Sequence, residues 1–173
     1  MTNRPPSLQR LGLLAIVSTV LFLWSSHHST AQPSIGGIGF GIMVPEPVAF
    51  TIKGGMGSGN AWDAAIGTSK FGNIRIHAEY LWNINAFSSR EVGLYLGVGG
   101  IIGFGRGKGV VFRGNGGEVE EDATSIGIRG VFGLNAFPFT APVELFVEIA
   151  PIFRLAPDSY FLTEAAVGVR YYP

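Results

Sequence analysis

Apolar and polar side chains alternate along residues 73–82, which read Asn-Ile-Arg-Ile-His-Ala-Glu-Tyr-Leu-Trp. Successive strand side chains point to opposite sides, so Ile74, Ile76 and Trp82 share one face while Arg75 and Glu79 share the other. A helix would scatter the same charges around its cylinder. The stretch has about the length that a tilted strand needs to cross a bilayer. The pattern therefore predicts a membrane-spanning strand with one apolar and one charged face.

The same period of two recurs in eight segments, which predicts an all-β fold: an eight-stranded antiparallel transmembrane up-and-down barrel. The segments are residues 35–43, 48–53, 62–67, 73–82, 91–103, 124–136, 143–150 and 161–171. Turn-forming residues separate most of them. The exception is residues 104–123, a long connection rich in glycine and charge. Bacterial barrels keep both ends periplasmic and place longer loops outside, so counting strands puts this connection on the external side.

Residues 1–31 have the anatomy of a secretory signal peptide. Arg4 and Arg10 precede an uncharged run over residues 11–24, and Ser29 and Ala31 are the small residues expected before a cleavage site. We therefore expect the mature barrel to occupy residues 32–173 as a single domain. An uncleaved membrane anchor is the alternative interpretation of the same segment.

Composition favours a membrane protein without spanning helices. Charged residues make up 14% of the chain, against roughly 25% in ordinary soluble domains. No apolar run after the leader is long enough for a spanning helix, and a closed barrel is then the way to pair every backbone group in lipid. No basic stripe indicates nucleic acid, and the absence of cysteine excludes disulfides. We expect the protein to lie in the bacterial outer membrane.

The polar face of the segments carries charges of both signs, which we expect to meet inside the barrel. Directing Arg or Lys toward the bilayer centre costs about 2–4 kcal/mol each. Eight strands leave an interior just wide enough for side chains, so a salt-bridged plug is favoured over a gated ion path. A soluble, lipocalin-like barrel is disfavoured because a soluble exterior would carry abundant Lys, Glu and Thr. The predicted lumen network comprises Lys53, Asp63, Arg75, His77, Glu79, Glu91, Arg129, Glu144, Glu148, Glu164 and Arg170.

Four stretches of the chain carry a family resemblance. They are residues 41–47, the run His-Ala-Glu-Tyr-Leu-Trp at 77–82, Glu-Leu-Phe-Val-Glu-Ile-Ala-Pro at 144–151, and Gly-Val-Arg-Tyr-Tyr at 168–172. With these the chain resembles the small eight-stranded outer-membrane barrels typified by the OmpA transmembrane domain. It is more similar still to uncharacterised bacterial outer-membrane barrels of that class. The resemblance implies the fold and an outer-membrane location, and it names no catalytic residue. We expect a monomer that contacts outer-membrane lipid and lipopolysaccharide and is inserted by the barrel assembly machinery.

An outer-membrane enzyme that modifies lipid A is the main alternative function. Hydrolysis requires a nucleophile and a base within hydrogen-bond reach. His77 is the only histidine of the expected mature chain, and Glu79 follows on the same face. Both should point into the lumen, away from lipid substrates, with no serine identifiably adjacent. We therefore expect a structural histidine, no catalytic residue, no cofactor and no metal site.

The long connection is the best candidate for contact with the outside. Its first half is basic and its second half acidic, and a mobile, solvated loop is the favoured interpretation. As a functional hypothesis, the basic half contacts lipopolysaccharide phosphates, or the loop engages an extracellular protein ligand. The acidic cluster lacks the glycine and spacing of a calcium-binding EF-hand loop. The candidate contact residues are Arg106, Lys108, Arg113, Glu118, Glu120, Glu121 and Asp122.

Overall fold

The structure is a computed structural model, which describes residues 37–84, 86, 87, 89, 91–109, 113, 114, 124–138 and 142–173. The expected signal peptide and the first residues of the expected mature chain lie outside the described residues. So does the acidic half of the long connection, which comprises Glu118, Glu120, Glu121 and Asp122.

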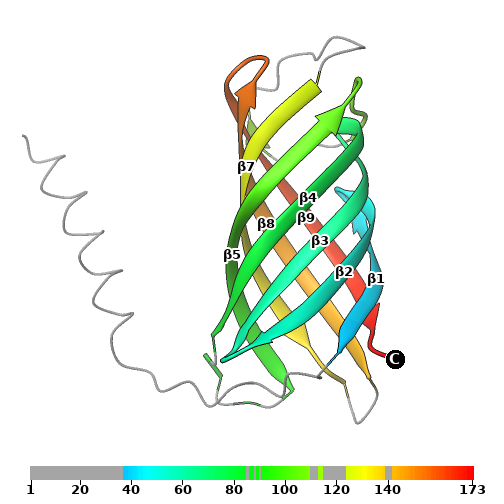
Figure 1. Ribbon diagram of the computed structural model, residues 1–173, viewed down its shortest axis with the longest axis vertical. Helices are drawn as coiled ribbons and strands as arrows, with labels where there is room; N and C mark the ends of the chain where they lie inside the picture. Colours follow the sequence, from blue (N-terminus) through cyan, green and yellow to red (C-terminus); the bar gives the residue numbers. More distant parts are fainter. Residues whose placement is uncertain are drawn as a thin grey trace, which may run out of the picture.

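The chain forms a closed, eight-stranded antiparallel up-and-down barrel, as the alternation predicted (Figure 1). Each long strand pairs with its neighbours in sequence, and β1 pairs with β9 from Phe40–Tyr171 to Pro45–Ala166, which closes the wall. Within the described residues, no helix has the length and apolar character needed to cross a bilayer. The long strands are β1 Ile38–Pro45, β2 Val48–Gly57, β3 Asn60–Ser69, β4 Gly72–Ile84, β5 Val92–Phe104, β7 Thr124–Ala136, β8 Val143–Ala156 and β9 Tyr160–Tyr171.

Several strands run further than the sequence pattern predicted. β8 continues past Pro151 to Ala156, although proline cannot donate a ladder hydrogen bond. Pro151 faces outward and still pairs with Thr163 of β9. On its other side, the register between β7 and β8 skips from the Arg129–Ile152 pair to the Phe132–Ile149 pair, so the missing donor falls where pairing is interrupted.

The two ends of the barrel differ in their connections. β2 and β3 are joined by a tight turn in which Gly57, Ser58 and Gly59 have φ values of 76°, 53° and 80°. Glycine adopts such left-handed conformations without steric cost, so two of the three positions are strain-free. This turn lies at the same end as the chain's C-terminus. The β1–β2, β3–β4, β5–β7 and β8–β9 connections lie at the opposite end, called here the loop end.

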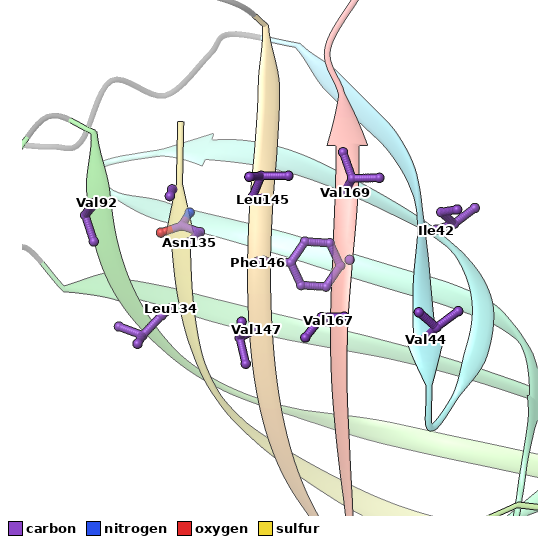
Figure 2. A pocket seen from close by; sticks show the side chains of 12 residues that line it. Ile42, Val44, Val92, Leu134, Asn135, Leu145, Phe146, Val147, Val167 and Val169 are labelled. Carbon is purple, nitrogen blue, oxygen red and sulfur yellow. The ribbon is translucent and has the colours of Figure 1, made fainter. Parts of the chain in front are cut away.

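The outer wall is apolar along almost every strand. Large apolar side chains with a third or more of their surface exposed alternate with buried ones. Figure 2 shows part of this surface, where Leu145, Val169 and Ile42 form a row across β8, β9 and β1. Val147, Val167 and Val44 form the next row on the same three strands. We call this outward-facing surface the apolar belt.

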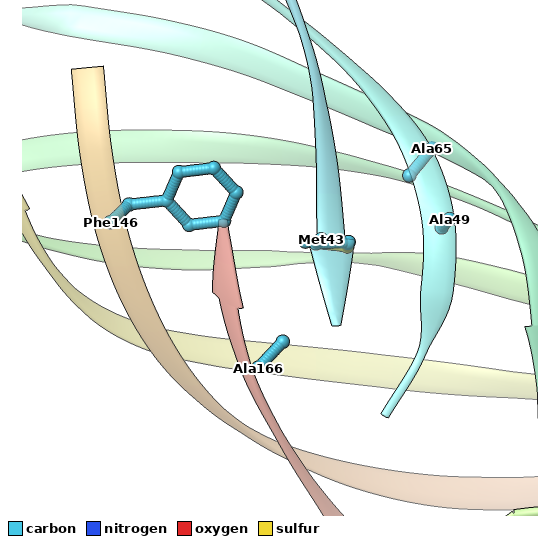
Figure 3. Close-up of a cluster of buried hydrophobic side chains, with 5 residues drawn as sticks. All are labelled: Met43, Ala49, Ala65, Phe146 and Ala166. Atoms are coloured by element: carbon cyan, nitrogen blue, oxygen red, sulfur yellow. The ribbon is translucent and has the colours of Figure 1, made fainter. Parts of the chain in front are cut away.

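The inner face mixes apolar clusters with charge. Phe146 of β8 lies across from Met43, Ala49, Ala65 and Ala166, contributed by β1, β2, β3 and β9 (Figure 3). A second cluster lies nearer the C-terminal end and a third lies toward the loop end. The second comprises Ala61, Leu81, Tyr95 and Val131, and the third comprises Phe71, Ile101, Ile152 and Leu162. The barrel therefore has a packed core and not an open channel through these layers.

The long connection after β5 joins the wall. Its two-residue strand β6, Arg113–Gly114, pairs with Thr163 and Leu162 of β9. β1 pairs with β9 only as far as Ala166, because the β1–β2 hairpin ends early at Pro45 and Pro47. β6 therefore occupies the edge of β9 that β1 leaves open. We call residues 105–109, 113 and 114 the strap.

Candidate functional site

The lumen holds one connected network of buried charges, with Arg170 at its centre. The Arg170 guanidinium donates to the carboxylate of Asp63, to Thr51 Oγ1 at 3.0 and 3.1 Å, and to Glu144 at 3.3 Å. Its flat face lies 3.8 Å from the centroid of the Phe146 ring. A guanidinium suits this position because its planar fork offers several donors at fixed angles.

Glu144 is the acceptor on which several donors converge. Lys53 Nζ donates to Oε1 at 2.6 Å and Asn135 Nδ2 donates to the same oxygen at 2.8 Å. Tyr172 donates its hydroxyl to Oε2 at 2.7 Å. Burial, and then the Glu144 charge beside it, raises the pKa of Tyr172 above its ordinary value of 10.0, so the phenol remains a neutral donor. With Arg170, four donors saturate this carboxylate, which makes burial of its charge tolerable.

A second branch runs through Arg129. This guanidinium donates to Glu79 and, at 3.3 Å, to Glu148. Glu148 also accepts the hydroxyl of Tyr95 at 2.7 Å and lies 3.8 Å from Arg170, which joins the two branches. Tyr95 adds a link that the sequence pattern placed on the inner face without assigning it to the network.

The third branch contains the histidine considered above as a candidate base. Arg75 donates to Glu164 at 2.5 Å and its Nη2 lies 2.5 Å from His77 Nδ1. Since arginine can only donate, His77 Nδ1 accepts and the ring proton resides on Nε2, 4.0 Å from Asp63. Its expected partner Glu79 is held by Arg129 instead. His77 is 2% exposed and accepts from Arg75, while its Nε2 has no hydrogen-bond partner among the described residues.

The network differs from the prediction at both ends of the barrel. Glu91 is exposed and lies in the bend before β5, which begins at Val92, so the alternation that assigned it to the lumen does not extend to it. Arg154 is a buried cation that the pattern missed, because the seventh segment was expected to end at residue 150. It stacks 3.9 Å from the Tyr160 ring centroid and donates to the Asp158 carbonyl oxygen at 2.9 Å. The other ten predicted members are all buried in the lumen.

Glycines on the inner face give the long side chains their space. A β-carbon on Gly41 would lie 2.7 Å from Arg170 Cγ, and one on Gly99 would lie 2.7 Å from Glu79 Cγ. Gly133 lies equally close beneath the Tyr95 ring. Arg170, Glu79 and Tyr95 thus each lie over a glycine of the adjoining strand, where a larger residue would collide with them.

The buried charges of the lumen are largely paired with one another. Five buried cations face five buried carboxylates on the described strands, so formal charge there is balanced. A sixth buried carboxylate, Glu46, lies in the β1–β2 turn next to Gly109. No group of three or more potential metal ligands is formed within the described part of the chain.

The chain matches no known family model, and neither the curated proteins nor the solved structures contain a match to it.

The described loop candidates lie on the strap at the rim of the loop end. Arg106 and Lys108 are exposed, and Arg113 contributes its backbone to β6. A β-carbon on Gly107 would lie 2.3 Å from the Ser69 carbonyl oxygen, and one on Gly109 would lie 2.2 Å from Glu46 Oε2. The strap thus packs against the β3–β4 turn and the β1–β2 turn. Gly107 and Gly109 therefore contact two neighbouring turns, whereas Arg106 and Lys108 are exposed to solvent.

Proposed function

We propose that the protein is a bacterial outer-membrane β-barrel with a filled, charge-paired lumen, acting as a structural or ligand-interacting protein without catalysis. The observation that carries the proposal is the inverted distribution of side chains. Charged residues fill the interior, whereas 29 large apolar side chains are exposed on the described surface. In water such a continuous apolar surface would promote aggregation, since soluble monomers rarely expose patches beyond a few hundred Å². Hydrocarbon is the solvent that this surface fits.

Strand length supports the same proposal. The eight long strands contain between 8 and 14 residues, and a tilted strand needs about 9–11 to cross the hydrocarbon core. The leader expected at residues 1–31 would direct the chain to the envelope, where the closed wall leaves no exposed strand edge in lipid. A soluble barrel is disfavoured because its interior would hold the apolar side chains that are found here on the outside.

The decisive experiment is cell fractionation followed by electrophoresis with and without boiling. We expect the protein in the outer-membrane fraction, with a folded form that migrates differently from the heated form. Recovery of folded protein from the soluble fraction, stable in buffer without detergent, would refute the proposal.

The filled lumen also favours a plug over a pore. Phe146, Tyr95 and Arg170 extend across the interior and are each at most 2% exposed. We expect no steady conductance steps when the protein is reconstituted in a planar bilayer. Regular conductance steps that are seen with this protein, and are absent when an unrelated barrel of the same size replaces it, would favour the ion path instead.

A further inference from the structure

A groove runs along the outer wall across β8, β9 and β1 and extends onto β7 and β5 (Figure 2). Its volume is about 510 Å³, within the range of about 300–1,000 Å³ found for small-ligand sites. Two rows of the apolar belt form its walls. The wall nearer the C-terminal end comprises Leu145, Val169 and Ile42, and the wall nearer the loop end comprises Val147, Val167 and Val44. We call this space the belt groove.

The floor of the belt groove is backbone, because the residues between the two rows point into the lumen. Phe146 pairs with Gly168, and Gly168 pairs with Met43. Phe146 and Met43 are 2% and 1% exposed, so their side chains do not fill the groove. Alternate residues of a strand are about 7 Å apart, whereas a helix is about 10–12 Å wide. A single hydrocarbon chain therefore fits between the walls and a helix does not.

The walls of the belt groove are stiff. Five of the six wall residues are Val or Ile, whose branched β-carbons restrict χ1. A bound chain would therefore not have to immobilise flexible side chains, and the groove is preorganised for an occupant. Among the described residues that line it, none is charged. The occupant that this lining fits is apolar along its length.

The opposite face of the barrel has no such pair of walls. The strand order places β4 across the barrel from β9. There Ala64, Ala78 and Gly100 pair directly across β3, β4 and β5, and their side chains are too short to form a wall. Nearer the C-terminal end, the Tyr80 and Trp82 rings lie edge to face at 4.9 Å and fill the space between successive rows. The belt therefore differs in shape between its two faces.

We propose that the belt groove holds one acyl chain of a membrane phospholipid more tightly than the rest of the belt does. The inference rests on the proposed function, since acyl chains reach the groove only when the belt lies in a bilayer. Lipid tails are as apolar as these side chains, so the preference comes from closer van der Waals contact and not from the hydrophobic effect. A chain between two walls contacts more carbon atoms than a chain on the flatter face.

The test is photolabelling of the protein in phosphatidylcholine vesicles that contain a small fraction of phosphatidylcholine with a diazirine in one acyl chain. Lipids labelled at several chain positions average over depth, and mass spectrometry of peptides locates the adducts. Val147 in the groove and Ile66 on the opposite face are each 51% exposed, so accessibility alone predicts equal labelling. We expect roughly fivefold more adducts in the groove, an excess that about five to ten additional carbon–carbon contacts would supply.

Matched variants separate the shape of the groove from general effects on the fold. Val147→Ala with Val167→Ala shortens a directly paired part of the wall nearer the loop end. The excess of adducts on the remaining wall should then fall to the level of the rest of the belt. Ile66→Ala with Ile76→Ala shortens a directly paired couple on the opposite face and should leave the excess unchanged. A gel without boiling confirms that both variants are folded.

Three outcomes would overturn the inference, and they differ in what else they refute. Equal labelling of the two faces in folded, inserted protein would overturn the preferred acyl chain and leave the proposed function intact. A deficit of adducts in the groove, together with dimers recovered by chemical crosslinking, would show that a second copy of the chain covers it. Failure of the native protein to insert into vesicles would refute the proposed function itself.

Discussion

Replacing Arg170 with methionine tests the electrostatic core of the barrel. Arg170→Met keeps much of the apolar stem over Phe146 but removes the donors to Asp63, Thr51 and Glu144. Breaking a buried ion pair by removing one partner costs about 3–5 kcal/mol, because the remaining charge stays buried without compensation. We expect a loss of that size in the free energy of unfolding.

The structure identifies which carboxylate loses its main hydrogen-bond donor in Arg170→Met. Glu144 keeps Lys53 at 2.6 Å and Tyr172 at 2.7 Å. Asp63 keeps only a hydroxyl contact with Thr51 at 3.3 Å and the distant His77 ring. The double variant Arg170→Met/Asp63→Asn should therefore recover at least about 2 kcal/mol of the loss. Arg170→Met/Glu144→Gln should recover nothing, because it removes the partner of Lys53.

Urea unfolding of the protein in lipid vesicles provides the measurement. The half-buried Trp62 and Trp82 report unfolding by fluorescence, and a gel without boiling reports the folded fraction. A loss below about 1 kcal/mol for Arg170→Met would contradict the reasoning. So would equal recovery by the Asp63 and Glu144 double variants, since the network would then not distinguish the two carboxylates.

Three further perturbations address the wall, the belt and the C-terminal end. Gly99→Ala should destabilise the fold by about 1–3 kcal/mol, because its β-carbon would lie 1.9 Å from the Ala78 carbonyl oxygen. Gly100→Ala is the control: its β-carbon would meet nothing within 4 Å, so it should be neutral in the same urea assay. Val147 lies in the apolar belt and is 51% exposed. Val147→Arg should lower the free energy of unfolding in vesicles by about 2–4 kcal/mol, whereas Phe87→Arg outside the strands should lower it by about 0–1 kcal/mol. Equal losses would argue against contact between this surface and hydrocarbon. Tyr172 has a raised pKa in the folded state, so its contribution is fully present below pH 10 and is lost as pH rises above 10, where the unfolded chain ionises first. Tyr172→Phe should accordingly reduce the fall in unfolding free energy above pH 10, and an unchanged slope would show that this hydroxyl is not linked to stability.

Alternation predicted the barrel and most of the lumen because successive side chains of a strand point to opposite faces. Arg75, Arg129 and Arg170 were placed inward on this ground, and the structure buries all three. The predicted side-chain directions are wrong or missing where the ends of a strand are misjudged. The seventh segment was expected to end at residue 150, which hid Arg154, and Glu91 was counted within a strand that begins one residue later.

The pairing of charges across the lumen could not be predicted from the pattern. Lys53 and Glu144 are separated by 91 residues and Arg170 and Thr51 by 119. Which side chains meet depends on the tilt and stagger of the strands, and alternation carries no information about either. The pairing of β6 with β9 was missed for a different reason: a two-residue strand is too short to show a period.

The contact between β6 and β9 has a consequence for the order of assembly. β9 follows β6 in the chain, so Arg113 and Gly114 have no edge to join until β9 has formed and paired with β8. The strap should therefore stay accessible to proteases during folding until β9 has paired with β8 and become protected when the barrel closes. The rate at which residues 105–109 become resistant to protease during refolding would thus report how fast the barrel wall closes.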